Sequence, residues 1–235
     1  MTEQRAPAGG WRTATGQDVS HPSARSVALR IEVPDRVDHL PGQHYVVRLT
    51  AEDGYTAQRS YSVASAPSDP LLELYVERLE DGEVSSYLAD VVAVGDEMEV
   101  RGPIGGWFVW AGEGVAVAVA GGSGVVPLVA MLRHAAYVGR PDLVRLAVAA
   151  RTVADLPYAG ELTAAGALVA LSREASPTGR PAGRLLAEEY TSLVEPGATF
   201  YVCGSAPFAE AASSALVAVG APTAAVRVER FGPTS

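Results

Sequence analysis

The sequence predicts two successive domains, an antiparallel all-β domain followed by an α/β domain built on a parallel sheet. Short strand patterns at close spacing, separated by Gly- and Pro-containing turns, fill residues 11–110 and predict a small antiparallel barrel. A continuous apolar run at 115–120 then leads into a Gly-rich turn, after which strand and helix patterns alternate. We therefore expect the domains to comprise residues 11–111 and 112–235.

Composition excludes several classes of protein. A formal net charge of -9 argues against a nucleic-acid-binding surface. The single cysteine, Cys203, allows neither an internal disulfide nor a four-thiolate iron–sulfur cluster, and the four histidines lack metal-ligand spacing. We find no signal-peptide pattern and no apolar segment of membrane-spanning length, so we expect a cytoplasmic protein with no membrane partner.

The first half is divided into short elements by turns such as Pro41-Gly42, Asp53-Gly54 and Gly102-Pro103. A helix is expected at 85–92, with Leu88 on its apolar face. Alternating or apolar segments of strand length are found at 26–33, 45–50, 72–77 and 97–101.

The second half alternates between strand and helix patterns, which favours right-handed parallel βαβ units. Helices are expected at 125–138 and 206–219, the second ending at Gly220. Strands are expected at 115–120, 143–149, 167–171, 199–203 and 226–229.

Two strand ends in this half carry residues that are suited to binding a ligand. Gly121-Gly122-Ser123-Gly124 follows the first strand and opens a helix, so its backbone N–H groups suit a pyrophosphate. Cys203-Gly204-Ser205-Ala206-Pro207 ends a later strand, and ligands of parallel sheets bind at the carboxyl ends of strands. The alternatives are a tight strand-to-helix turn for the first segment and a small buried hydrophobe for Cys203.

Two segments of the first half suggest a phosphate-bearing planar ligand. In a strand, Arg59 and Tyr61 point one way while Ser60 and Ser62 point the other, which offers a phosphate ligand and a flat ring. Ser85 and Ser86 stand at an expected helix start, which is an anion site. The alternatives are a solvated side-chain ladder and simple N-capping by either serine.

Taken in order, five motifs resemble those of the ferredoxin–NADP reductase superfamily over almost the whole chain, from about Trp11 to Phe231. The motifs are Arg59-Ser60-Tyr61-Ser62, Gly82-Glu83-Val84-Ser85, Gly102-Pro103-Ile104-Gly105, Gly121-Gly122-Ser123-Gly124 with Pro127, and Cys203-Gly204-Ser205 with Pro207. The resemblance implies an FAD-binding β-barrel followed by a Rossmann-like NAD(P)-binding domain.

The resemblance also implies residue roles at FAD. Arg59 would bind its phosphate, Tyr61 would pack on the isoalloxazine, and Ser62 would hydrogen-bond near flavin N5. Phe231 would cover one flavin face, although Gly232-Pro233-Thr234-Ser235 continues past it and packing against the barrel is the alternative. The full set expected at FAD is Arg59, Tyr61, Ser62, Val63, Tyr75, Val76, Glu77, Gly82, Val84, Ser85, Ser86 and Phe231.

On the dinucleotide side, Cys203-Gly204 matches the place where nicotinamide meets flavin, and Glu229 could assist protonation. Ser172 and Arg173 resemble the pair that holds a 2′-phosphate, with Arg180 and Arg184 following, so NADP is expected ahead of NAD. The expected NADP set is Gly121, Gly122, Ser123, Gly124, Pro127, Arg151, Ser172, Arg173, Cys203, Gly204 and Pro207, and the expected catalytic set is Ser62, Cys203 and Glu229.

The resemblance thus implies a flavoprotein oxidoreductase that transfers a hydride between NAD(P)H and bound FAD. Electrons would pass to a separate protein, such as a ferredoxin or an oxygenase component. Two alternatives remain open, an NAD(P)H-dependent reductase of free flavin and a non-catalytic FAD-binding subunit that senses redox state.

Overall fold

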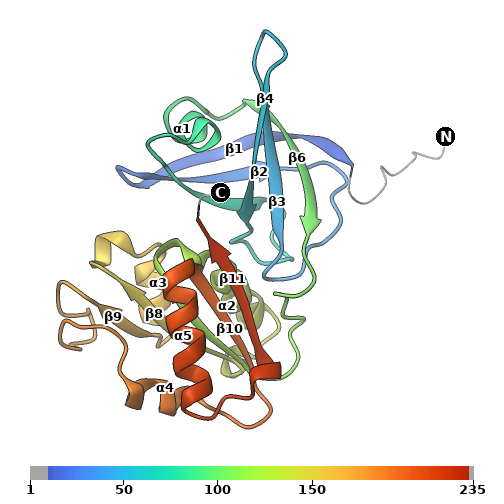
Figure 1. Ribbon diagram of the computed structural model, residues 1–235. Coiled ribbons are helices and arrows are strands. Elements are labelled where there is room, and N and C mark those ends of the chain that lie inside the picture. The colour runs from blue at the N-terminus through green and yellow to red at the C-terminus, as the bar shows by residue number, and fades with distance from the viewer. Residues whose placement is uncertain (1–9, 233–235) are drawn as a thin grey trace. The chain divides into compact units, whose positions relative to one another are not determined.

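The computed structural model describes residues 10–232 and divides into two compact units, residues 1–109 and 110–235. Unit 1 is built on an antiparallel sheet and unit 2 on a parallel α/β sheet (Figure 1). This agrees with the fold class expected from the sequence.

Unit 1 holds a sheet that has six strands within the described residues, in the order β4-β3-β6-β1-β2-β5. The two outer strands meet at one end, where Val63 bridges Leu74 and the Ala64 N–H donates to the Glu73 carbonyl at 2.8 Å. The elements are β1 Trp11–Ser23, β2 Ser26–Glu32, β3 His44–Thr50, β4 Thr56–Ser62, β5 Leu72–Glu77, α1 Glu83–Asp90 and β6 Glu97–Ile104.

The core of unit 1 explains why α1 lies where it does. Val84 and Leu88 of α1 are buried together with Leu29, Val47 and Leu74 of the strands. Burying such side chains stabilises the fold by about 1.5–3 kcal/mol each. The helix therefore packs near β4 and β5, the two outer strands, which carry the polar motifs predicted from the sequence.

Several element boundaries in unit 1 differ from the prediction. Strand β1 was not predicted, because most of its side chains are exposed or half-buried and no period-two apolar pattern results. Strand β6 was expected to end at Arg101 but continues through Gly102-Pro103 to Ile104, so that dipeptide lies within a strand rather than a turn.

Unit 2 is a parallel sheet in the order β11-β10-β7-β8-β9. Its strands are β7 Ala116–Gly121, β8 Val144–Ala150, β9 Leu168–Leu171, β10 Thr199–Ser205 and β11 Val226–Phe231. Its helices are α2 Val126–Tyr137, α3 Ala159–Ala164, α4 Ala187–Leu193 and α5 Ala206–Ala218. The short helices α3 and α4 were not predicted from the sequence.

Both faces of this sheet are covered, with α5 in front of the strands and α2 behind them in Figure 1. Val117 and Val119 pack with α4 and α5, while Ala118 and Ala120 are fully buried on the opposite side of the same strand. Double burial explains the continuous apolar run in β7. No helix among the described residues is long and apolar enough to cross a membrane.

Strand order reverses between β7 and β10. The chain runs outward from β7 through β8 to β9, and then returns to the other side of β7 as β10 and β11. Crevices for ligands form at such reversals, outside the carboxyl ends of the strands. The two glycine-containing turns predicted from the sequence follow these two strands.

Candidate functional site

The strongest sign of a ligand in unit 1 is a pair of buried hydroxyls at the end of β4. The Tyr61 Oη and Ser62 Oγ atoms are buried and have no hydrogen-bond partner among residues 10–232. An unsatisfied buried polar atom costs about 1–3 kcal/mol, so two in succession suit a ligand that supplies the missing partners. Burial also raises the pKa of Tyr61, so its hydroxyl stays protonated and can donate.

The N-terminus of α1 offers free donors close to this strand. Gly82 is the N-cap and no side chain caps the helix, so the first-turn N–H groups are available to an anion. A Cβ at Gly82 would stand 2.2 Å from the Ser85 Oγ and 2.9 Å from the Leu79 Cβ, so glycine is needed here.

N-capping by serine, the alternative considered for this segment, is wrong. Ser85 and Ser86 lie inside the helix, and their hydroxyls bond back to the preceding turn. The Ser85 Oγ accepts from the Leu79 N–H and donates to the Gly82 carbonyl, and the Ser86 Oγ donates to the Leu79 carbonyl at 3.1 Å. These bonds shape the turn that precedes the N-terminal end of the helix.

The other residues expected at FAD divide into two kinds. Arg59 is exposed on β4, where its Nη1 donates to the Gln58 carbonyl at 2.7 Å, and Tyr75 and Glu77 lie on β5. The side chains of Val63, Val76 and Val84 are buried in the core, so only their main chains can face a ligand.

In unit 2 the two predicted turns lie against each other. Strands β7 and β10 pair in parallel with Ala120 opposite Cys203, so both chains leave the sheet at the same edge. A Cβ at Gly124 would lie 2.4 Å from the Cys203 carbonyl oxygen, and one at Gly121 would lie 2.7 Å from the Phe208 ring. The glycines therefore allow close packing of the turns, and Gly122 adopts a φ of 56° that favours glycine.

Cys203 and Glu229 are neighbours on adjacent strands, since β10 and β11 pair with these residues opposite each other. Burial raises the pKa of Glu229 to about 7, and its Oε2 is buried with no hydrogen-bond partner in the described part of the chain. Burial, with a smaller contribution from Glu229, raises the pKa of the Cys203 thiol well above its usual value. Cys203 is therefore an uncharged thiol, whereas Glu229 can exchange a proton near neutral pH.

Residues expected to choose between NADP and NAD follow β8 and β9. The Ser172 and Arg173 N–H groups donate to the carbonyls of Ala150 and Arg151, so the two loops lie side by side. Arg151 pairs with Asp155 at 3.1 Å, and the Glu174 carboxylate accepts from the Val153 N–H. Positive and negative charges are thus interspersed at this edge.

Arg180 is not placed like the residues that were expected to distinguish NADP from NAD. Its guanidinium is largely buried and makes two bonds to Glu189, at 2.6 and 2.9 Å, as well as bonds to main-chain carbonyls. A guanidinium with these partners anchors its own loop. Phe231 ends β11 opposite Ser205, where it is half-buried.

His44 was not among the residues expected from the sequence. This residue lies on β3 directly opposite Ser62 of β4, and burial lowers its pKa. No local pattern could have identified this neighbourhood, because it depends on which residue the neighbouring strand places beside His44.

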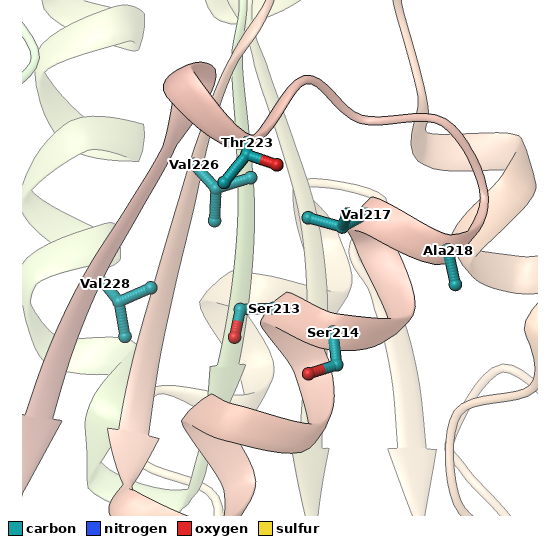
Figure 2. Close-up of a pocket in the computed structure, with 7 residues that line it drawn as sticks. All are labelled: Ser213, Ser214, Val217, Ala218, Thr223, Val226 and Val228. Carbon is teal, nitrogen blue, oxygen red and sulfur yellow. The ribbon is translucent and has the colours of Figure 1, made fainter.

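A surface hollow of about 470 Å³ lies elsewhere on unit 2, between α5 and β11 (Figure 2). Its walls carry apolar and hydroxyl side chains and no charged group; the residues are Ser213, Ser214, Val217, Ala218, Thr223, Val226 and Val228. Because it offers no positive charge, it does not match a phosphate-bearing ligand.

Comparison with protein families gives two adjacent matches. Residues 14–109 match the oxidoreductase FAD-binding domain, and residues 118–214 match the oxidoreductase NAD-binding domain. The first match includes β4, β5 and α1, and the second includes the turns after β7 and β10. The buried hydroxyls and the open helix N-terminus of unit 1 fit FAD.

Relatives of known role are parts of oxygenase systems. The chain is 30% identical over 224 residues to the reductase component of propane 2-monooxygenase from Rhodococcus jostii, covering 87% of this chain and 59% of that protein. It is 28% identical to the electron transfer component of 2-halobenzoate 1,2-dioxygenase from Burkholderia cepacia, covering 94% of this chain and 68% of that protein. The chain thus spans about three fifths of the length of the first of these relatives.

Solved structures share the fold. The FAD/NAD-binding domain of nitric oxide dioxygenase from Vibrio cholerae matches with a TM-score of 0.82 at 26% identity, covering 96% of this chain and all of that one. A ferredoxin NADP+ reductase from Neisseria gonorrhoeae, with bound FAD and NADP, matches with a TM-score of 0.80 at 20% identity, covering 94% and 98%. The second likeness, at this identity, concerns the fold alone.

Proposed function

Because the chain belongs to the ferredoxin–NADP reductase superfamily, we propose that it is an FAD-dependent NAD(P)H oxidoreductase that passes electrons to a separate protein. The named relatives that serve oxygenases support a ferredoxin or an oxygenase component as that acceptor. Residues 11–111 form the FAD-binding domain in this proposal, and residues 112–235 form the NAD(P)-binding domain.

The observation that carries this proposal is a pair of buried hydroxyls, Tyr61 Oη and Ser62 Oγ, which find no partner among the residues that the structure describes and lie on the FAD-binding domain. A domain that only packed its core would satisfy or expose these atoms. Flavin carbonyl and ring nitrogen atoms are acceptors and donors of the required kind. The same chain carries the glycine turn at the strand-order reversal, which supplies the dinucleotide site.

When bound, FAD supplies the redox chemistry, accepting a hydride and releasing electrons. The residues of the chain hold the cofactor and the dinucleotide in place and protect them from solvent. Arg59 and the first-turn N–H groups of α1 bind phosphate, while Tyr61 and Ser62 fix the flavin ring. In unit 2 the turn at Gly121–Gly124 holds the dinucleotide pyrophosphate, and Glu229 exchanges a proton near neutral pH.

We favour NADP over NAD because Arg173 is exposed at the end of β9, beside a hydroxyl from Ser172. We also propose a cytoplasmic location, where both nicotinamide dinucleotides are available. Fractionation of cells that express the chain would test this, and recovery outside the cytoplasmic fraction would contradict it.

The function is tested by the spectrum of the purified protein. We expect flavin absorbance, or its appearance on incubation with FAD, and anaerobic bleaching by NADPH. Bleached protein should then reduce a ferredoxin faster than free FMN. A protein that takes up no FAD contradicts the proposal, and faster turnover with free FMN would identify a flavin reductase instead.

Arg59→Ala provides a sharper test of the FAD site. Loss of a charge-assisted phosphate contact should weaken FAD binding roughly 10- to 100-fold, measured by quenching of flavin fluorescence. Arg25→Ala, which removes another exposed arginine of unit 1, serves as the control. Equal affinities of the Arg59 variant and the wild type would remove Arg59 from the site.

A further inference from the structure

Tyr55 lies at the tip of the hairpin that joins β3 to β4, and its main chain and its side chain are both held in place. Its carbonyl accepts from the Ala51 N–H at 2.8 Å, which continues the β3–β4 ladder by one step. Its own N–H donates to the Asp53 Oδ1 at 3.0 Å, and its hydroxyl donates to the Glu83 Oε2 at 2.9 Å. Because 56% of Tyr55 is nevertheless exposed, an aromatic ring in a fixed position remains accessible to a ligand.

This ring stands beside the residues proposed to bind the phosphates of FAD. Glu83, which accepts the hydrogen bond from Tyr55, belongs to the first turn of α1. That hydrogen bond raises the pKa of Tyr55, and the positive charge of Arg59 acts weakly in the opposite direction, so Arg59 is also near the ring. Side chains alternate along an extended chain, which places Tyr55 on the same side of the hairpin as Arg59 and Tyr61.

The proposed function gives the cofactor a direction along β4. The flavin ring is assigned to Tyr61 and Ser62 at the end of the strand, and the phosphates to Arg59 and the N-terminus of α1. Adenosine is the part of FAD that lies beyond its phosphates. A cofactor that continues in the same direction brings its adenosine to the start of β4, where Tyr55 is bonded to the first turn of α1.

We propose that the Tyr55 ring receives the adenine base of FAD and that Glu83 is the residue that positions this ring. Bases stack on aromatic side chains through their flat π faces, so a fixed and accessible phenol ring is sufficient for the contact. FMN contains the flavin and one phosphate but no adenosine, and the contact therefore favours FAD over FMN. This inference rests on the proposed function, because it needs flavin at Tyr61 and phosphate at α1.

A tie between the hairpin and α1 is the structural role that the same hydrogen bond could have, but it does not need an exposed ring. Ala57 and Tyr61, on the same side of the strand, pack against the core of unit 1. Tyr55 is not among the described side chains that pack on this core. A ring that is held in place before its ligand arrives loses little conformational freedom on binding, which suits a binding surface.

The test titrates the flavin-free protein with FAD and, separately, with FMN, and follows the change in flavin fluorescence. Tyr55→Ala should weaken FAD binding by about 5- to 100-fold, the usual effect of removing an aromatic ring from a stacked base. Its affinity for FMN should stay within about twofold of the wild type, since FMN has no base to stack. The ratio of the two affinities is thus the quantity that reports the contact.

Conservative variants separate the ring from the group that positions it. Tyr55→Phe keeps the ring and should retain more of the preference for FAD than Tyr55→Ala. Glu83→Ala should reduce the preference, and Glu83→Gln, which still offers an acceptor to the Tyr55 hydroxyl, should restore it. Tyr137→Ala removes a more exposed tyrosine from unit 2 and should bind both flavins as the wild type does.

The outcomes distinguish this inference from the function on which it rests. Equal loss of FAD and FMN affinity in Tyr55→Ala would overturn the adenine contact, because a loosened hairpin disturbs the phosphate site that both flavins share. Unchanged FAD affinity in that variant would overturn it as well. A wild-type protein that binds neither flavin would overturn the proposed function itself.

Discussion

Glu229 shows how a single residue acquires properties that its sequence neighbours do not suggest. It lies between Val228 and Arg230 near the end of the chain, a context that would leave its pKa near the ordinary 4.5. Placement on β11 beside buried Cys203 removes water from its carboxylate and raises the pKa to about 7. The folded protein therefore binds a proton at Glu229 that the unfolded chain loses between these pH values.

This shift predicts a pH-dependent stability. Between pH 4.5 and 7 the folded state holds more protons at Glu229 than the unfolded state, so the free energy of unfolding falls as pH rises through this window. Glu229→Gln should therefore be more stable than the wild type at pH 8, by up to about 3 kcal/mol, and similar to it below pH 5. Urea denaturation at both pH values measures this, and a difference independent of pH would contradict it.

Arg173 carries a prediction about the choice of dinucleotide. If its exposed guanidinium binds the 2′-phosphate, Arg173→Ala should raise the KM for NADPH roughly tenfold or more while changing the KM for NADH less than twofold. Arg140→Ala, which removes an exposed arginine of unit 2 that is paired with Asp142, is the control. Equal changes for both dinucleotides would mean that Arg173 does not bind the 2′-phosphate.

At the scale of elements, the turn between β7 and α2 depends on the turn that follows β10. Gly124 packs directly on the Cys203 carbonyl, with no space for a side chain. Gly160, in α3, has open space around its Cα, and its backbone does not require glycine. Close packing therefore requires glycine at position 124 but not at position 160, a difference that the sequence does not show.

We expect Gly124→Ala to destabilise unit 2 by about 1–3 kcal/mol, because main-chain atoms must move to admit the Cβ. Gly160→Ala should be neutral or stabilising by up to about 1 kcal/mol, since alanine favours a helix. Denaturant unfolding followed by circular dichroism would compare them. Equal stability of the Gly124→Ala and Gly160→Ala variants would contradict this prediction.

Most long elements could be predicted from the sequence because their apolar periodicity is local. Strand β5 was predicted with the observed bounds, and α2 and α5 to within a residue at each end. Strand β1 could not be predicted, since buried and exposed side chains alternate only weakly along it. The short helices α3 and α4 carry too few buried side chains to give a helical pattern.

The molecule as a whole distributes its charge unevenly. Residues 10–109 contain 16 Asp and Glu against 8 Arg, whereas residues 110–235 contain 10 against 9. Nearly all of the net charge of -9 thus resides on the FAD-binding unit. Such a field attracts carriers of positive surface charge and repels acidic ones.

This asymmetry predicts a salt dependence of electron transfer. Reduction of a basic haem protein such as cytochrome c should have a kcat/KM that falls on the order of tenfold between low and high ionic strength, because screening weakens long-range attraction. Uncharged quinones serve as the control acceptor and should show little change. A rate with cytochrome c that is flat or rises with salt would argue against attraction by the acidic unit.

The sequence by itself determined the fold class, the order of the two domains and the motifs assigned to each cofactor, because these depend on local periodicity and on residues close together in the chain. Tertiary structure decided what depends on neighbours from distant segments. It brought His44 beside Ser62, removed water from Glu229 and bound Arg180 to Glu189. Strand pairing and burial set hydrogen-bond partners and pKa values, and neither is encoded in any one stretch of the chain.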